Sequence, residues 1–327
     1  MIIEKQGAGI KSNLLYCPIE KYDRLFFSLM DYLNNLFTSN DYKDILKFYD
    51  YFDDREQLIK WMRERPKGNY RIVEFNKENN DIIVVIPTMD VNGKFALNCK
   101  NEIFKGLHII FVESGYNNYY FNYAHNCNAG IKKAMEYNPK WIIVSNDDMY
   151  KIDDIEVLKN KLLKINNNEI YCVFTKPSKY HSSPERIAER NILFYFYYLK
   201  NRYSRAILKL IKKFNIKYSM CPISGKFSML FKKGYEYLEI QDFAIFSSNF
   251  IKITEGKIFD ETFINGAEDT DLSLKLSLNP NKITIIDYKI GDYIGSTRGL
   301  GITTSLRSIA GETYLNYKWF DFLNDIL

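Results

Sequence analysis

The chain has 327 residues, of which 46% are hydrophobic and 16% aromatic, and its net charge is +5. This length can bury a full core in one large domain or two, and no apolar run is long enough to span a bilayer. No signal peptide opens the sequence, and the five cysteines are scattered without a CxxC pair, so we expect free thiols in a reducing compartment and a cytoplasmic protein, soluble or peripheral at the inner face of the membrane.

Residues 1–80 are predicted to form a mainly helical N-terminal extension. Apolar residues between positions 22 and 33 recur at helical spacing, and Asp53 with Glu56 forms a candidate capping box for a later helix. We expect this extension to pack on the rest of the chain. Docking of a partner protein is the alternative.

Three apolar runs follow, at 81–87 (DIIVVIP), 107–113 (LHIIFVE) and 141–144 (WIIV), and each leads into polar residues. The segments between them, 95–104 and 124–135, have helical spacing. Alternating strands and helices indicate right-handed crossovers and a parallel sheet. The sequence therefore predicts an α/β fold with a mostly parallel sheet.

The third run ends on two adjacent carboxylates, Asp147 and Asp148. In open α/β sheets, ligands bind beyond the carboxyl ends of the strands, and paired acids there can hold a divalent cation against the phosphates of a nucleotide. The same Asn-Asp-Asp sequence also suits an ordinary turn whose side chains bond their own backbone. The polar ends of the neighbouring strands favour the first interpretation.

Beyond the acid pair, Asp153 or Asp154 is predicted to cap a helix, and residues 170–175 are predicted to form a strand. A basic insert then spans 183–217, where nine Lys or Arg oppose two Glu, giving a local charge of +7 in a chain whose total is +5. Within it, apolar and aromatic residues recur at helical spacing over 192–214.

Two interpretations of this helix are open: it packs on the core with its charges solvated, or it lies in an anionic membrane interface. Nucleic-acid binding is not expected because no recognised motif accompanies the charges.

Five segments follow one another along the chain: VVIPTMD at 84–90, IIFVESG at 109–115, HNCNAGIKKA at 125–134, SNDDM at 145–149 and KIFDETFINGAEDTDLSLKL at 257–276. Together they resemble the motifs of the family 2 glycosyltransferases, which are inverting sugar transferases with the GT-A fold. The resemblance covers roughly residues 81–300, and the pairing of two acidic motifs in this order makes it specific.

The resemblance implies a GT-A catalytic domain over 81–327, a Rossmann-like, mostly parallel sheet with helices on both faces. Residues 81–150 would form its nucleotide-binding half and 151–327 its acceptor half. The implied activity is metal-dependent, inverting transfer of a sugar from a nucleoside-diphosphate sugar to a hydroxyl of a glycan, a lipid-linked acceptor or a protein. Mn²⁺ or Mg²⁺ would be the cofactor.

For the donor nucleotide, the resemblance implies contacts from both halves of the domain. Asn128 would contact the nucleotide or merely cap its helix. Arg298, in the GSTRG segment, would meet the diphosphate. The base and ribose would be held by Pro87, Thr88, Asp90, Glu113 and Ser114, although the family usually has Asp at the position of Glu113.

The metal and the chemistry would depend on acids. Asp148 would contact the cation directly, and Asp147 would assist it or lie nearer the ribose. Many family members add a His ligand near the GSTRG segment; here Asp292 stands at about that place and could replace it. Asp269, the second acid of the ED pair, would be the catalytic base, although acids at a helix start often only complement the helix dipole.

Two other classes of protein remain open. A sugar-nucleotide nucleotidyltransferase would share the sheet and the metal, but it should carry a Gly-rich basic loop after the first strand, where this chain has IPTMD. A catalytically silent nucleotide-sugar-binding protein on the same fold is the other possibility, since the His is missing and Glu113 departs from the family pattern.

Overall fold

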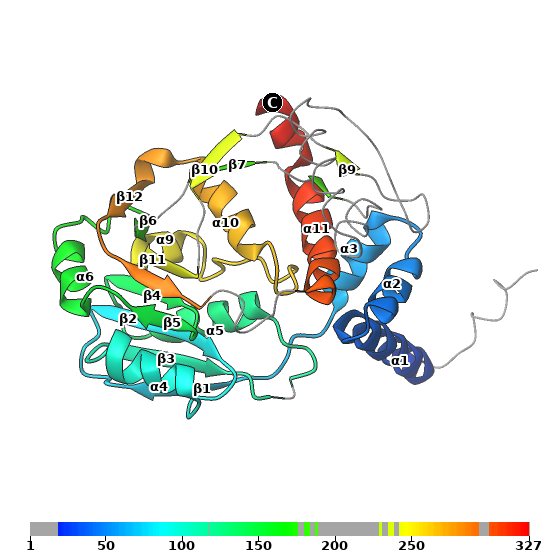
Figure 1. Ribbon diagram of the computed structural model, residues 1–327, viewed down its shortest axis with the longest axis horizontal. Coiled ribbons are helices and arrows are strands. Elements are labelled where there is room, and N and C mark those ends of the chain that lie inside the picture. Colours follow the sequence, from blue (N-terminus) through cyan, green and yellow to red (C-terminus); the bar gives the residue numbers. More distant parts are fainter. Residues whose placement is uncertain are drawn as a thin grey trace, which may run out of the picture.

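The computed structural model describes residues 19–116, 118–175, 180–183, 187–188, 229–230, 235–238, 242–293 and 301–326. The chain folds into a mixed α/β structure in which a seven-stranded sheet lies between helices, and a group of further helices stands beside it (Figure 1).

The strand order in the large sheet is β1-β3-β2-β4-β11-β6-β12. Strand β2 pairs in parallel with both β3 and β4, and β6 pairs in parallel with β12. Strands β1 and β11 run in the opposite direction to the other five. The predicted mostly parallel sheet is therefore confirmed. The strands are β1 Arg71–Phe75, β2 Ile82–Thr88, β3 His108–Glu113, β4 Trp141–Ser145, β6 Cys172–Thr175, β11 Phe243–Ser247 and β12 Ile283–Ile286.

Helices cover both faces of this sheet because alternate residues of each buried strand face opposite sides. Ile82, Val84 and Ile86 of β2 belong to one apolar core, with α4 (Lys94–Asn98) and α6 (Ile155–Leu162). Ile83 and Val85 belong to another, with α5 (Tyr123–Met135), α9 (Ser248–Ile253) and α10 (Glu268–Ser277). Asp154, rather than Asp153, caps α6 by accepting from the amide of Glu156 at 3.0 Å.

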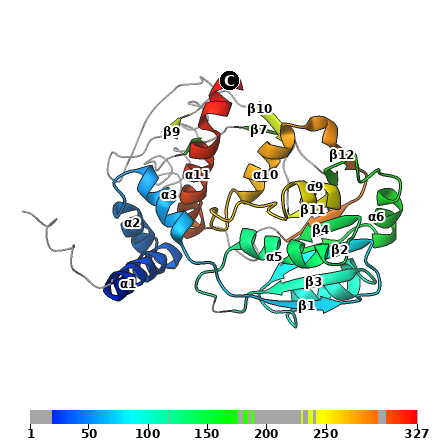
Figure 2. The ribbon, with the colours of Figure 1, turned by 180° about the vertical axis from the view of Figure 1, so that it is seen from behind.

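A third core joins the N-terminal helices to the C-terminal one. Helices α1 (Ile19–Thr38), α2 (Tyr42–Asp50) and α3 (Arg55–Glu64) pack around Phe48 and Trp61. The same core contains Phe263 and residues of α11 (Ile302–Ile326). Seen from either side, α11 stands between α10 and the N-terminal helices (Figures 1 and 2).

The N-terminal segment is mainly helical, as predicted, but one cap lies at a different residue and a strand was not predicted. The cap of α3 is Asp54, which accepts from the amide of Gln57, so the predicted capping box at Asp53 and Glu56 is wrong by one residue. The segment is also not wholly helical. Residues 71–75 form β1, which joins the edge of the sheet with Arg71 opposite Glu113.

The helix predicted over 95–104 is regular only as far as Asn98. Residues Cys99–Ile103 form a π-helical turn, closed by a bond from the amide of Phe104 to the carbonyl of Cys99 at 2.8 Å. The side chains of Asn98 and Cys99 bind the carbonyls of Met149 and Asp147 at 3.1 and 3.2 Å. The turn is therefore tied to the loop after β4, and π turns of this kind frequently occur at functional sites.

Smaller elements complete the described residues. Three short antiparallel pairs join β5 (Met149–Lys151) with β13 (Ile290–Asp292), β7 (Tyr180–Ser183) with β10 (Tyr235–Leu238), and β8 (Ile187–Ala188) with β9 (Met229–Leu230). A 3₁₀ turn covers Pro280–Lys282. The predicted helix at 192–214, within the basic insert, lies outside the described residues. Among the described helices, none combines the length and the apolar character that crossing a bilayer requires.

Candidate functional site

The parallel strands β2, β3 and β4 end at one edge of the sheet. Thr88, the last residue of β2, is opposite Glu113, the last of β3, and Val85 of β2 is opposite Val144 near the end of β4. Pro87 is buried inside β2, one residue before this edge. The loop after β4, which carries the acid pair, therefore begins beside the end of β2. This is the edge at which open α/β sheets bind their ligands.

Asp147 is fixed in this loop by its neighbours. The hydroxyl of Thr88 donates to Asp147 Oδ2 at 2.6 Å, and the thiol of Cys99 donates to its carbonyl at 3.2 Å. Burial raises the pKa of Asp147; the hydrogen bond from Thr88 opposes this shift and the charge of Asp148 adds to it. The two carboxylates are adjacent and partly or fully buried, so a bound cation would offset their mutual repulsion.

Asp148 is 7% exposed, and its carbonyl accepts from the amide of Tyr293 at 3.0 Å. Asp292 is opposite Met149 in the β5–β13 pair, so the structure brings it within one residue of Asp148 along the ladder. Even so, the described residues contain no group of three or more His, Cys, Asp or Glu placed to hold a metal ion. A three-acid metal site that includes Asp292 stays a prediction, and Arg298 lies outside the described residues.

The end of β3 presents a second polar group. Glu113 pairs with Arg71 of β1, and its other oxygen accepts from the amide of Val91 at 3.4 Å. Ser114 binds the carbonyl of Thr88 through its amide at 2.9 Å and its hydroxyl at 3.2 Å. The loops after β2 and β3 are thus joined beside the acid pair.

Asp90 is half-buried and accepts from the hydroxyl of Tyr116 at 3.1 Å. Sequence reasoning missed both Tyr116 and Arg71. Nothing in the local sequence marks either residue. Arg71 comes opposite Glu113 only because the unpredicted strand β1 pairs with β3.

Asn128 has a different local role from a helix cap. Asn122 caps α5, whereas Asn128 lies within the helix and is bound on both sides of its amide group. Its nitrogen donates to the carbonyl of Phe259 at 2.8 Å and to the carboxylate of Glu261 at 3.0 Å, and its oxygen accepts from the amide of Phe259 at 3.1 Å. The capping alternative is therefore wrong.

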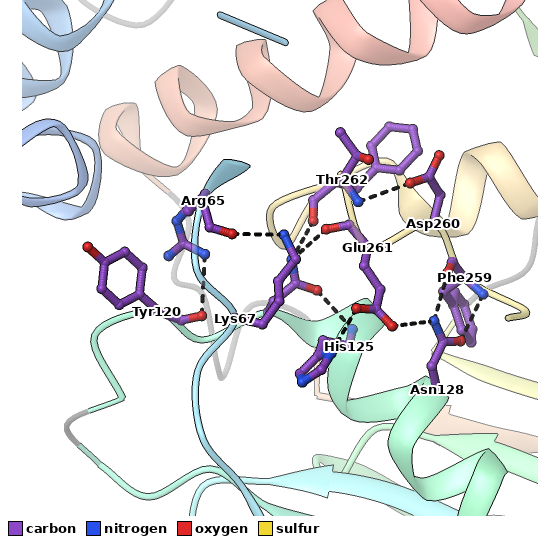
Figure 3. A network of polar contacts seen from close by, with 11 residues as sticks. Arg65, Lys67, Tyr120, His125, Asn128, Phe259, Asp260, Glu261 and Thr262 are labelled. Atoms are coloured by element: carbon purple, nitrogen blue, oxygen red, sulfur yellow. Dashed lines mark hydrogen bonds and ion pairs between the residues drawn. The ribbon is translucent and has the colours of Figure 1, made fainter. Parts of the chain in front are cut away.

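Figure 3 shows how this network joins α5 to the segment before α10. The side chains of Asn128 and His125 both point at Glu261, and the ring nitrogen of His125 lies 2.8 Å from its carboxylate. Asn122 adds bonds to the carbonyls of Glu261 and Phe263 at 3.0 and 2.8 Å. The FDETF motif is thereby bound to the helix that follows β3. The Phe-Asp-Glu sequence at 259–261 was the feature of the sequence that pointed to Glu261.

The second acidic motif forms the first turn of α10. Asp269 is partly exposed, and its carboxylate accepts from the amide of Thr270 at 2.8 Å. Asp271 is buried between Lys318 and Trp319 of α11, with Nζ and Nε1 at 2.9 and 2.8 Å. Of these two acids, Asp269 has the accessible carboxylate, as a base requires.

The pKa of Tyr123, the first residue of α5, responds to acids beside both acidic motifs. Burial raises the pKa of Tyr123 well above its usual range, and Cys127, Asp242 and Glu268 raise it further. Asp242 binds Asn146 of the acid loop through both backbone and side chain, at 2.9 and 2.5 Å. Glu268 is the first residue of α10. Charges beside both motifs therefore act on one tyrosine.

No family model matches this chain, and no curated protein matches it either.

Proposed function

We propose that the protein is a metal-dependent inverting glycosyltransferase of the GT-A type, which moves a sugar from a nucleoside-diphosphate sugar to an acceptor hydroxyl. The observation that carries the proposal is the bond from Thr88 to Asp147 at the common edge of β2, β3 and β4. This bond holds Asp147 next to the end of β2, beside Glu113 and Ser114 at the end of β3. A nucleotide lying across these strand ends would have its base at Glu113 and its diphosphate at the acids.

The donor groups fit a hard divalent cation. Asp147 and Asp148 supply carboxylate oxygens, and Mg²⁺ is commonly bound by one or two carboxylates together with the phosphates of a substrate. When bound, the metal neutralises charge on the departing diphosphate.

The chemistry assigned to the chain itself is a single displacement. Asp269 accepts the proton of the acceptor hydroxyl while that oxygen attacks the anomeric carbon. The bond from the anomeric carbon to the diphosphate oxygen breaks, and the nucleoside diphosphate leaves with the electron pair. Attack from the opposite face inverts the anomeric configuration, and no covalent intermediate on the protein is needed.

A panel of nucleoside-diphosphate sugars, each incubated with and without Mn²⁺, tests the proposal. Metal-dependent release of nucleoside diphosphate from one donor is expected. Asp148→Ala should abolish that release, whereas Asp81→Ala, which removes an exposed acid paired with Lys140 at the surface, should not. Formation of a nucleotide sugar from a nucleoside triphosphate would indicate a nucleotidyltransferase instead. Binding of a donor without any turnover would indicate a silent binding protein.

A further inference from the structure

Helix α11 lies against the turn that precedes α10. A Cβ atom placed on Gly311 would be 2.4 Å from the carbonyl oxygen of Gly266, 3.1 Å from its carbonyl carbon and 3.5 Å from Cβ of Ala267. Because the nearest atoms belong to backbone, the turn itself would have to move to admit a side chain. The absence of a side chain at residue 311 thus sets how closely the helix approaches the turn.

The turn has an unusual conformation that its surroundings must maintain. Asn265 and Ala267 have φ angles of 54° and 71°, in the left-handed region that residues with a Cβ seldom adopt. Asn265 is held by two bonds of its side chain: Oδ1 accepts from the amide of Tyr123 at 2.7 Å, and Nδ2 donates to the carbonyl of Phe121 at 3.2 Å. Ala267 is the N-cap residue before α10 and makes no side-chain capping bond. Such conformations persist where neighbouring structure holds them, often at functional sites.

A second contact holds both ends of the segment 260–271. Lys318 Nζ lies 2.8 Å from the carboxylate of Asp260 and 2.9 Å from that of Asp271. Trp319 donates to the other oxygen of Asp271 at 2.8 Å. The hydroxyl of Tyr314 also donates to Asp260 at 2.8 Å. The chain between these two acids contains the turn and Asp269.

Helix α11 is in turn held by the N-terminal helices. Arg307 donates to the carbonyls of Phe37, Thr38 and Ser39, at the end of α1, at distances of 3.1, 2.9 and 2.7 Å. The hydroxyl of Tyr49 in α2 donates to the carbonyl of Leu306 at 2.7 Å. A continuous set of contacts therefore runs from the N-terminal extension through α11 to the start of α10.

We infer that α11 is a clamp that positions Asp269, with Gly311, Lys318 and Trp319 as its positioning residues, and that the N-terminal helices hold this clamp in place. The inference rests on the proposed function for the role of Asp269 as base. The contacts of the clamp residues are to the segment 260–271, on the acceptor side of the proposed site. Loss of the clamp should therefore lower turnover without weakening donor binding.

The test combines amide hydrogen exchange with kinetics on the full chain. Lys318→Met removes the bridging cation, and Trp319→Phe removes one hydrogen bond while keeping an aromatic ring, in case the first variant does not fold. In both variants the amides of residues 267–273 should exchange at least tenfold faster than in the wild type. The exchange rates of the β2 amides should be unchanged. Turnover should fall roughly 10- to 100-fold, as small displacements of a reacting group produce, with donor KM within about twofold.

Two further variants serve as controls. Lys318→Arg retains a cation for both acids and should restore turnover to near the wild-type value, which a general loss of stability would not allow. Lys60→Met removes an exposed surface pair in α3 and should change neither measurement.

The outcomes separate the two claims. Wild-type protein inactive with every donor would contradict the proposed function, while the exchange data would still decide whether the clamp exists. Unchanged exchange at 267–273 in both Lys318→Met and Trp319→Phe would overturn the clamp. Faster exchange with unchanged turnover in an active enzyme would show that the clamp does not position Asp269.

Discussion

Replacing Gly130 by Ala should destabilise the protein, although the same change in an open helix would stabilise it. Gly130 lies in α5, on the face that packs against the sheet. A Cβ atom there would be 2.3 Å from Cγ1 of Val85 and 2.8 Å from Cγ2 of Val112. Carbon atoms in contact normally lie about 3.5–4.0 Å apart, so α5 or the two valines must shift by roughly 1 Å.

The magnitude follows from two opposing effects. Ala gains about 1 kcal/mol over Gly in helix propensity. Overpacking in a well-packed core costs about 1–3 kcal/mol, and the upper end applies because both neighbours are valines with little rotamer freedom. We expect Gly130→Ala to lower the free energy of unfolding by about 2 kcal/mol.

Urea denaturation followed by tryptophan fluorescence measures this change. Val85→Ala removes the methyl group that the new Cβ would meet, so the double variant should be more stable than the sum of the two single changes by about 1 kcal/mol or more. A Gly130→Ala variant as stable as wild type, or more stable, would refute the close packing of α5 on β2 and β3.

Three further predictions concern other parts of the chain. Asp148→Ala should abolish metal-dependent nucleotide binding in calorimetry with and without Mn²⁺, and unchanged affinity would remove Asp148 from the site. Burial alone would raise the pKa of Asp260, but Lys318, the amide of Thr262 and Tyr314 together lower it below the ordinary value of 3.8. The stability it contributes is present above that value and lost as pH falls through the lower folded pKa, so Asp260→Asn should lose less stability than wild type in urea titrations below about pH 4. If residues 192–214 form an interfacial helix, the protein should co-sediment with anionic liposomes and be released by salt, and replacing Lys209, Lys212 and Lys213 by Glu should prevent it. Absence of binding at low salt would end that interpretation.

The part of the fold that could be predicted is the part whose signal is local. Strands β2, β3 and β4 are apolar runs that stop at polar residues, and α5 has clear helical spacing before Pro139. Because strand ends in a parallel sheet share one edge, the nearness of the Asp147–Asp148 loop to Thr88 followed from the same pattern.

The remainder depends on contacts between distant residues. Strand β1 is a short edge strand in which no residue is fully buried, so the apolar pattern of RIVEF carries little signal. The burial of Asp271 is due to Lys318 and Trp319, 47 and 48 residues further along the chain. The role of Asn128 likewise depends on Phe259 and Glu261, which only the folded chain brings to it.

Transfer kinetics of Asp269→Asn test the central claim most directly. The amide keeps the shape of the side chain but cannot accept a proton, so sugar transfer should fall by roughly 10²-fold or more while donor affinity, measured by calorimetry with Mn²⁺, stays close to the wild-type value. Asp154→Asn, which changes an exposed acid at the start of α6, is the matched control and should transfer normally. Near-normal transfer by Asp269→Asn would contradict the account.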